Sequence, residues 1–494
     1  MLNNSDKLLQ LKKIKTAAEK ITSKNSTDKM SARSKMMLLF DEGSFVELNC
    51  FDSEEGQGVV TGYGAVNDRL VYAYVQNSSV LGGAIGTIEA EKILNVLKLA
   101  EKTGAPVVSI VDSKGVKIEE GIDVLNSLGE LFAKTASLSG VVPQISVISG
   151  PCAGGSVFVP SASDFVFTIK NVSGMYLTGP SVTRGITGKD TDSEKLGGAV
   201  VLGKNGIADF VCDSEEICFA EVRNLINFLP SNNLEVAVDL STDDINRISE
   251  NLNYAVADEG KPYNMKGIIA EIADNNIVIE NKKDFAKSII TAFVKLNGVT
   301  VGVVANQPDV DNGIIDIDAA SKAASFILKC DSFNIPVVTF VDTDGFAIGE
   351  QYENKGISKA VTKLLGAYAG ATVPKITVVV RKAYGSAYLA MGSKSVGADF
   401  VFAYPTAEIA VLSAETAANI LYNDKIAGSA NPMKSRPNII QEFRDKDASP
   451  YEAAKKGYVD DIIVPETTRQ RLISALELLA SKRVSNIAKK HSNL

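Results

Sequence analysis

Small residues follow two apolar segments of the sequence, and they are the first candidates for chemistry. In VISGPCAGGSVF a predicted strand ends at Ser149, and the run from Gly150 to Ser156 opens the next predicted helix. In VVVRKAYGSAYLAM the run from Tyr384 to Ala387 occupies the same setting. Glycine lets a ligand approach the backbone closely, and unpaired N–H groups at a helix start attract negative charge. Each turn can therefore stabilise an anion, with tight helix packing as the alternative for either turn taken alone.

An acidic, glycine-containing loop precedes each of these turns. The first loop lies in APVVSIVDSKGVKIEEG and contains Asp112, and the second lies in IPVVTFVDTDGFAIGEQ and contains Asp342. Two loop-and-turn pairs in one chain favour two anion-stabilising sites over packing alone. The two aspartates could instead bind a metal, but no cluster of further ligands accompanies them, and we predict no metal site.

The loops and turns belong to an internal repeat, which indicates the elements that position them. Residues 141–167, VVPQISVISGPCAGGSVFVPSASDFVF, correspond to residues 372–402, TVPKITVVVRKAYGSAYLAMGSKSVGADFVF. A helical pattern lies between the matched strands of each copy, and the order of strand, helix, strand and small-residue helix is typical of an α/β fold. We predict two equivalent domains, residues 1–245 and 246–494, joined by the polar stretch near residues 230 to 255.

The composition excludes several classes of function. The 494 residues include one histidine, His491, so a histidine-based triad, a histidine-rich zinc site or a histidine general base would have to use this residue of a lysine-rich tail, and we expect the chemistry to use other groups. The formal net charge of −8 argues against nucleic acid as the main partner. The five cysteines form no CxxC pair, and a reducing cytoplasm fits them best. No apolar run is long enough to span a membrane, and the first 22 residues predict a helix rather than a signal peptide.

Longer motifs extend over nearly the whole chain. The N-terminal half contains ARSKMMLLFDEGSFVEL, VVTGYGAVNDRLVYAYVQNSSVLGGAIG and GPCAGG. The C-terminal half contains GIIDIDAASKAASFILKCDSFNIPVVTFVD, ATVPKITVVVRKAYGSAY, PTAEIAVL and SPYEAAKKGYVDDIIVP. With these motifs in this order, the chain resembles the carboxyltransferase subunits of biotin-dependent acyl-CoA carboxylases and decarboxylases, the family of propionyl-CoA carboxylase beta and methylmalonyl-CoA decarboxylase alpha subunits.

The resemblance implies an architecture and an assembly. It implies an α/β fold of duplicated crotonase-like (ClpP/crotonase) domains and a homo-hexamer built as a trimer of dimers. The active site is implied to form between the N-terminal half of one subunit and the C-terminal half of another. Acyl-CoA would bind mainly to the N-terminal half and biotin mainly to the C-terminal half.

The resemblance also implies a mechanism that depends on backbone N–H donors. Carboxybiotin loses CO₂, the biotin enolate removes a proton from the acyl-CoA α-carbon, and the thioester enolate attacks CO₂; in reverse, the site decarboxylates a malonyl-type thioester. The thioester enolate is implied to be held by Val116 and Gly155. The biotin enolate is implied to be held by Phe346, Ser386 and Ala387. The neighbouring positions implied to bind substrate are Lys114, Gly115, Gly154, Gly385 and Leu389, of which the last influences the choice of acyl group.

The first loop departs from the usual pattern of the family. DSKGVKIEEG stands where relatives usually have DSGGARIQEG, so Lys114 replaces a glycine and Val116 replaces an alanine. Lys114 is either a solvated surface lysine or a contact to a CoA phosphate or a substrate carboxylate. We favour the substrate contact, because the loop borders the expected pocket.

Cofactor and partners follow from the same resemblance. Neither Met265-Lys266 nor Met433-Lys434 lies in the A-M-K-M context of a biotin attachment site, so biotin is expected on a separate carrier protein, and coenzyme A enters as the substrate thioester. A biotin carboxylase or a membrane decarboxylase subunit would complete a complex that is cytoplasmic or peripheral to a membrane. Two alternatives stay open. One is an enoyl-CoA hydratase or isomerase of crotonase type that uses Glu119 or Glu120 as its acid or base, and the other is a non-catalytic scaffold subunit.

Overall fold

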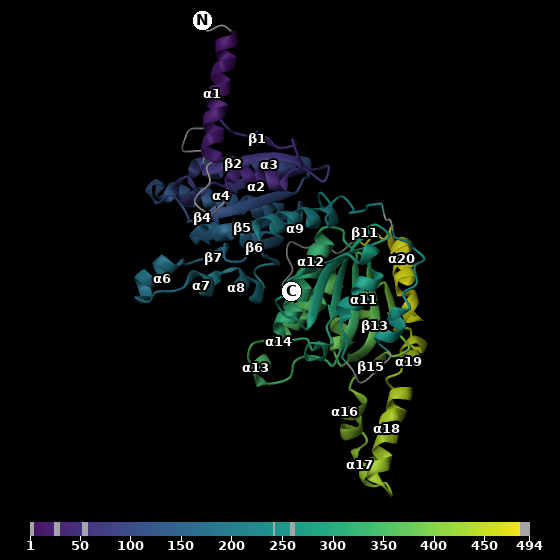
Figure 1. Ribbon diagram of the computed structural model, residues 1–494. Helices are drawn as coiled ribbons and strands as arrows, with labels where there is room; N and C mark the ends of the chain where they lie inside the picture. The colour runs from purple at the N-terminus through teal and green to yellow at the C-terminus, as the bar shows by residue number, and fades with distance from the viewer. Residues whose placement is uncertain (1–3, 24–29, 52–57, 241–242, 257–261, 485–494) are drawn as a thin grey trace. The chain divides into compact units, whose positions relative to one another are not determined.

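The computed structural model describes residues 4–23, 30–51, 58–240, 243–256 and 262–484 (Figure 1). The chain divides into two compact units, Met1–Val236 and Ala237–Leu494. The division falls inside the polar stretch near residues 230 to 255 that separates the two copies of the repeat, a few residues before the boundary that we predict after residue 245. His491 lies outside the described residues.

The first unit is built on an eight-stranded sheet whose central strands are parallel. An antiparallel hairpin, β2 (Val59–Val66) and β3 (Arg69–Gln76), leads into the parallel part. The parallel strands that follow β3 are β4 (Val107–Ser113), β5 (Gln144–Ala153), β6 (Phe165–Ile169) and β8 (Phe210–Cys212). Two short strands complete the sheet, β1 (Val46–Leu48) beside β2 and β7 (Gly174–Tyr176) beside β5.

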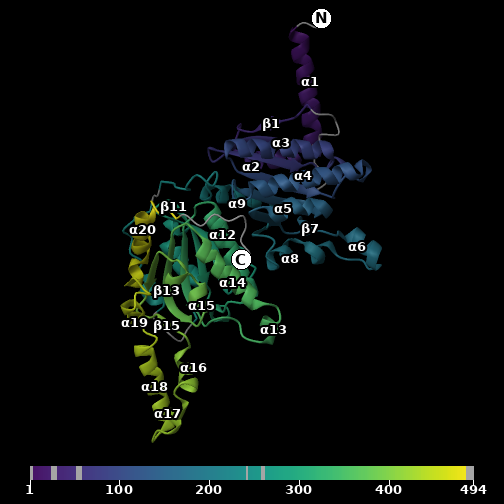
Figure 2. The same ribbon diagram turned by 180° about the vertical axis from the view of Figure 1, so that it is seen from behind.

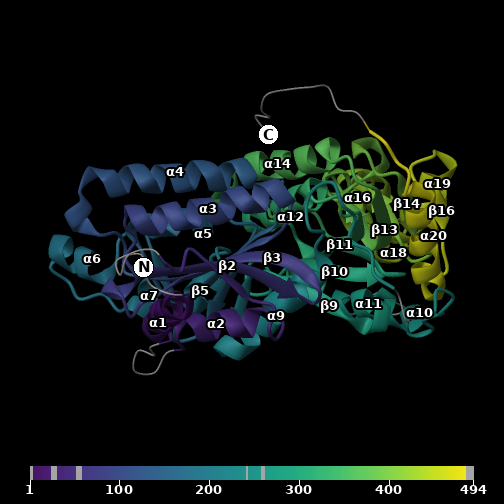
Figure 3. The same ribbon diagram turned by 90° about the horizontal axis from the view of Figure 1, so that it is seen from above.

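Helices cover both faces of this sheet. Figure 3 shows α3 (Thr87–Thr103) and α4 (Ile122–Leu138) along one face, and α2 (Ala32–Leu39) and α9 (Glu215–Phe228) along the other. Every residue of β4 is buried, because a parallel strand covered on both faces has no side open to water. α3 ends at Gly104, whose φ of 63° is the left-handed conformation that glycine adopts without strain.

The second unit repeats this architecture strand for strand. Its strands are β9 (Val278–Asn281), β10 (Ile289–Leu296), β11 (Val299–Asn306), β12 (Val337–Thr343), β13 (Lys375–Tyr384), β14 (Phe400–Ala403), β15 (Glu408–Ala410) and β16 (Asp461–Ile462), in the same spatial order. The registers agree as well, since Tyr72 lies opposite Val107 in the first sheet and Gly302 lies opposite Val337 in the second. The predicted duplication is therefore confirmed.

The helices of the second unit differ at its C-terminal end. α12 (Ile317–Ser332) and α14 (Ile357–Gly370) correspond to α3 and α4, and α11 (Met265–Ile272) and α20 (Thr468–Leu479) pack on the other face with the apolar core. A helical hairpin of α16 (Ala414–Ile420), α17 (Asn423–Ala427) and α18 (Pro432–Lys446) extends away from the sheet (Figure 2). The remaining α-helices are α1 (Asn4–Thr22), α5 (Phe158–Ala162), α6 (Pro180–Thr187), α7 (Ser193–Gly197), α8 (Ala199–Lys204), α10 (Asn251–Ala255), α13 (Glu350–Glu353), α15 (Ala387–Ala390) and α19 (Pro450–Lys455).

One predicted boundary is wrong. The sequence suggests that the strand before the first turn ends at Ser149, but β5 continues to Ala153. Its last three residues pair with β7, and this partner extends the strand through glycine and proline residues that would otherwise end it. The turn therefore begins only at Gly154.

The described part of the chain contains neither a membrane-spanning helix nor a cluster of metal ligands. None of its helices is long and apolar enough to cross a membrane. Within the same residues, no group of three or more His, Cys, Asp or Glu side chains could hold a metal ion. The five cysteines are all free.

Candidate active site

The first acidic loop and the first turn meet at the ends of β4 and β5. Ser113 is the last residue of β4 and lies opposite Cys152, one residue before the end of β5. The hydroxyl oxygens of Ser113 and Ser156 lie 3.2 Å apart. The ends of two neighbouring parallel strands thus bring the loop with Lys114, Gly115 and Val116 beside the turn.

The backbone of the first loop directs the N–H group of Val116 away from Ile85, the residue with which the loop pairs. Ile85 donates its N–H to the carbonyl oxygen of Gly115 at 3.0 Å, and its own carbonyl oxygen accepts from the N–H of Lys117 at 2.9 Å. This parallel bridge uses the residues on either side of Val116. Because peptide groups alternate along an extended chain, the N–H of Val116 points away from Ile85.

The turn supplies a second N–H group. Gly154 and Gly155 are the first two residues of a 3₁₀ turn, Gly154–Val157, and the first N–H groups of a helical turn have no partner inside it. Gly154 has a φ of 64°, which favours glycine. A Cβ atom at Gly155 would lie 2.6 Å from Cδ1 of Leu128 in α4, so a side chain at this position requires the leucine or the turn to shift.

Buried charges hold the first loop in place. The ammonium of Lys117 lies 3.1 Å from the carboxylate of Glu89 in α3, and both side chains are buried. A carboxylate oxygen of Glu120 accepts the N–H of Thr87 at 2.6 Å, at the first residue of α3. Glu120 therefore caps a helix, which disfavours its use as the acid or base of a hydratase or isomerase. Glu119 is exposed beside it.

Lys114 is exposed, in contrast to Lys117. Its backbone N–H donates to the carbonyl oxygen of Gly82 at 3.1 Å, and its aliphatic stem lies against the same glycine. The side chain thus reaches the solvent beside the loop, where its ammonium is accessible to a phosphate or a carboxylate.

The second unit builds the same loop with different residues. Thr343 takes the place of Ser113, and its hydroxyl oxygen accepts the N–H of Gly345 at 3.1 Å. Ile315 donates its N–H to Gly345 and accepts from Ala347, each at 3.0 Å, so this bridge directs the N–H of Phe346 away from Ile315. Phe346 is the counterpart of Val116.

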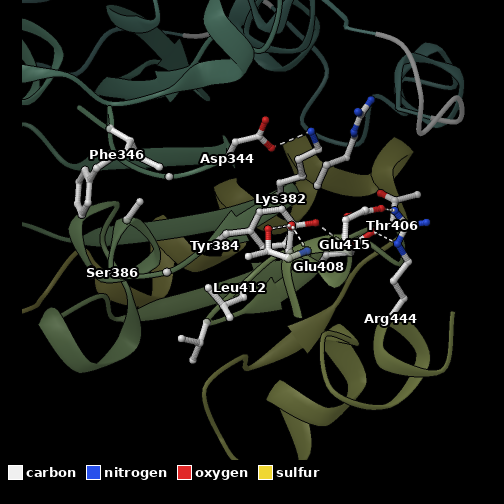
Figure 4. A pocket seen from close by; sticks show the side chains of 18 residues that line it. Asp344, Phe346, Lys382, Tyr384, Ser386, Thr406, Glu408, Leu412, Glu415 and Arg444 are labelled. Carbon is white, nitrogen blue, oxygen red and sulfur yellow. Dashed lines mark hydrogen bonds and ion pairs between the residues drawn. The ribbon is translucent and has the colours of Figure 1, made fainter. Parts of the chain in front are cut away.

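A cavity of about 750 Å³ opens between this loop and the second turn. Phe346, Gly385, Ser386 and Ala387 all line it, and Figure 4 shows Phe346 and Ser386 on one side of it. Ser386 precedes α15 and Ala387 is its first residue, so the first N–H groups of this turn lack partners within the helix. Leu389 lies outside the lining of the cavity and is 37% exposed.

The opposite side of the cavity is ionic (Figure 4). Lys382 lies 2.8 Å from Asp344, and Arg444 lies 2.6 Å from Glu415. The hydroxyl of Tyr384 donates to the carboxylate of Glu408. Burial, followed by the hydrogen bond to this carboxylate, raises the pKa of Tyr384, so the phenol stays protonated and remains a donor at neutral pH.

Sequence reasoning did not single out these ionic residues. They come from the loop after β12 and from β13, β15, α16 and α18, which folding brings together. Part of the signal lay in motifs already noted, since IPVVTFVDTDGFAIGEQ contains Asp344, VVVRKAYGSAYLAM contains Lys382 and Tyr384, and PTAEIAVL contains Glu408.

The two strand-end aspartates pair with cations. Asp112 lies 3.8 Å from the ammonium of Lys35, and Asp342 lies 3.6 Å from the guanidinium of Arg381. Burial raises the pKa of Asp342, and the charge of Arg381 opposes this effect. Asp342 also accepts the N–H of Lys382 at 3.1 Å. Asp342 therefore fixes the backbone of β13 next to the second turn, as expected for a residue that orients a site, and Asp112 binds Lys35 at the equivalent place.

Comparison with known proteins gives a consistent result. Residues 23–494 match the family model described as a carboxyl transferase domain. The methylmalonyl-CoA decarboxylase subunit alpha of Propionigenium modestum is 44% identical over 505 residues, 98% of this chain and 98% of the relative. The propionyl-CoA carboxylase carboxyltransferase subunit of Haloferax mediterranei is 42% identical over 491 residues, 96% of this chain and 95% of the relative.

A solved structure is similarly close. The crystal structure of transcarboxylase 12S, a hexamer described with methylmalonyl-coenzyme A and methylmalonic acid bound, is 40% identical and has a TM-score of 0.95. The match covers 100% of this chain and 98% of that chain. This likeness confirms the predicted duplicated crotonase-like fold. With the family model, the relatives and the fold in agreement over nearly its whole length, the chain belongs to the carboxyl transferase family and is a carboxyltransferase.

Proposed function

We propose that this carboxyltransferase moves a carboxyl group between carboxybiotin, carried by a separate protein, and the α-carbon of a short acyl-CoA such as propionyl-CoA. The observation that carries the proposal is the cavity of about 750 Å³ in the second unit. Its lining brings together Phe346, Gly385, Ser386 and Ala387, four residues that the family resemblance assigns to the biotin side.

The first unit binds the acyl-CoA in this proposal. Loss of the α-proton places negative charge on the thioester oxygen, and the N–H groups of Val116 and Gly155 stabilise that charge. Gly115 and Gly154 allow the close approach of the thioester to the backbone, because both have positive φ angles and no side chain. Removal of one donor from an oxyanion hole typically lowers kcat by about 10²–10³-fold, so these two groups account for a large part of catalysis.

The second unit binds biotin, which when bound supplies the CO₂ group and accepts the α-proton. The N–H groups of Phe346, Ser386 and Ala387 would hold the urea oxygen as it becomes negative. The residues fit such a group, since their N–H groups lie at the wall of a cavity and face no helix partner. No side-chain acid or base is required.

Two side chains influence which substrate is accepted. Lys114 projects from the loop next to Val116, and we assign its ammonium to a CoA phosphate or a substrate carboxylate. Leu389 is apolar and offers no charged partner to a carboxylate on the acyl group. The apolar Leu389 favours a short, uncharged acyl chain such as propionyl, with methylmalonyl-CoA as the carboxylated form.

The proposed function also includes partner proteins and an assembly of subunits. Residues 1–245 form the acyl-CoA domain and residues 246–494 the biotin domain, which meet between subunits of a homo-hexamer, a trimer of dimers. The transcarboxylase 12S crystal structure is described as a hexamer, which supports this assembly. The partners are a biotin carboxyl carrier protein and either a biotin carboxylase or a membrane decarboxylase subunit, in the cytoplasm or peripheral to a membrane complex.

The test uses purified full-length protein with methylmalonyl-CoA labelled in its free carboxyl group. We expect release of propionyl-CoA that depends on added biotin or biotinylated carrier, with the label recovered in carboxybiotin or CO₂. Turnover of enoyl-CoA without biotin would instead indicate a hydratase or isomerase. Binding of CoA thioesters without any reaction would indicate a scaffold subunit, and either result would refute the proposal.

A further inference from the structure

The second turn has a support that the first turn lacks. β13 and the short strand β15 are parallel neighbours, and Tyr384 lies opposite Ala410 while Lys382 lies opposite Glu408. The N–H of Gly385 continues this pairing and donates to the carbonyl oxygen of Ala410 at 2.9 Å. The turn that begins at Gly385 is therefore attached to β15 through the backbone.

Side chains reinforce the same attachment. Tyr384 is buried, and its hydroxyl donates to one carboxylate oxygen of Glu408. The other carboxylate oxygen of Glu408 lies 3.5 Å from Nε of Arg444 in α18, whose guanidinium also lies 2.6 Å from Glu415. Figure 4 shows this chain of side chains from Tyr384 to Arg444 along the cavity wall.

The equivalent place in the first unit is built without these groups. There β5 pairs with β7 in the same register, so Ala153 stands at the position of Tyr384 and Gly174 at the position of Glu408. The first turn folds nonetheless, as Gly154–Val157. A turn of this kind can therefore form without the hydrogen-bonded side chains Tyr384, Glu408 and Arg444. Their role in the second unit must lie beyond formation of the turn.

We infer that Tyr384, Glu408 and Arg444 form a positioning network that fixes the N–H groups of Ser386 and Ala387 at the wall of the cavity. The inference rests on the proposed function, because it assigns the network to the biotin side of carboxyl transfer. Backbone donors stabilise a developing negative charge only when they are held in place beforehand. Arg444 is the link to the α16–α18 hairpin, and Glu408 carries its effect to the tyrosine next to the turn.

The first experiment removes one oxygen atom from the network. In Tyr384→Phe we expect kcat for biotin-dependent transfer to fall about tenfold, with the KM for acyl-CoA within about twofold of wild type, because acyl-CoA binds in the other unit. The matched control is Tyr404→Phe, since the hydroxyl of Tyr404 is also buried and hydrogen-bonded, to Thr468 at 2.8 Å, but lies outside the cavity lining. Equal losses in both variants, or no loss in Tyr384→Phe, would overturn the inference.

The second experiment tests whether the residues act together. Arg444→Gln should lower kcat several-fold, whereas Lys446→Gln on the same helix, which removes only an exposed pair with Glu442, should not. The double variant Tyr384→Phe/Arg444→Gln should lose little more than the worse single variant, because both changes release the same turn. Fully multiplicative losses would refute a shared network.

A readout without turnover separates this inference from the proposed function. Amide hydrogen exchange of the peptide covering residues 383–390 should be faster in Tyr384→Phe and Arg444→Gln than in wild type and in the two controls. If wild type transfers no carboxyl group to biotin, the proposed function fails, and exchange alone decides whether the network holds the turn. Unchanged exchange in both variants would refute the network whatever the activity.

Discussion

Gly155→Ala should abolish most of the catalysis without unfolding the protein. The added Cβ would lie 2.6 Å from Cδ1 of Leu128, whereas carbon atoms in contact prefer about 3.5–4.0 Å. Either Leu128 or the turn must therefore move by about 1 Å. Cδ1 is the end of a flexible side chain, but Leu128 is 9% exposed and packs in the apolar core of its unit, so we expect the turn to take part of the shift and to carry the N–H of Gly155 with it.

The size of the effect follows from this displacement. A 1 Å error in the position of a reacting group can lower the rate by about 10²-fold, which corresponds to about 2.7 kcal/mol of activation free energy. Gly155 has a negative φ, so alanine introduces no backbone strain there, and the clash with Leu128 should cost about 1–3 kcal/mol of the free energy of unfolding, which leaves the protein folded. The assay is kcat for formation of propionyl-CoA from methylmalonyl-CoA with biotin.

Two further variants test whether the contact with Leu128 is the cause of the loss of kcat. Gly267→Ala is the control for the substitution itself, since nothing lies within 4 Å of a Cβ atom at that exposed helical position. Leu128→Val removes the clashing Cδ1 atom, and the double variant Gly155→Ala/Leu128→Val should recover at least tenfold of the lost kcat. A wild-type kcat in Gly155→Ala, or no recovery in the double variant, would refute the assignment of this turn.

Three other changes test separate parts of the structure. Lys114→Gln should raise the KM for acyl-CoA about five- to tenfold with kcat unchanged, and an unchanged KM would make Lys114 a solvated surface residue. Glu120→Gln keeps the oxygen that accepts the N–H of Thr87 and should retain most of the carboxyl transfer, whereas complete loss would revive an acid–base role for this residue. Burial lowers the pKa of Lys322 to about 7, so between about pH 7 and 10 the unfolded chain binds a proton that the folded chain has released. The free energy of unfolding should therefore rise with pH across this interval, and urea unfolding at pH 7 and pH 9 should lose the rise in Lys322→Met.

Local patterns in the sequence were sufficient to predict the repeat, the helices between the matched strands and the two loop-and-turn pairs. Apolar runs, glycines and helical periodicity are properties of neighbouring residues, and they act in the same way wherever the chain is placed. The end of β5 was misjudged because it depends on pairing with β7, which lies some 20 residues further along the chain. The role of Glu120 also escaped prediction, because its partner Thr87 belongs to another element.

The aspartates near the ends of β4 and β12 show most clearly what the sequence determined and what the tertiary structure decided. The sequence by itself placed Asp112 and Asp342 at equivalent strand ends beside equivalent loops. Only the tertiary structure decided their cations, which are Lys35 from α2 in the first unit and Arg381 from β13 in the second. A buried carboxylate requires a nearby positive charge, but any element that reaches the site can supply it. The same reason explains why Tyr384, Glu408 and Arg444 met only in the folded chain: local periodicity determines an element, whereas charge and hydrogen-bond partners are chosen by whatever packs against it.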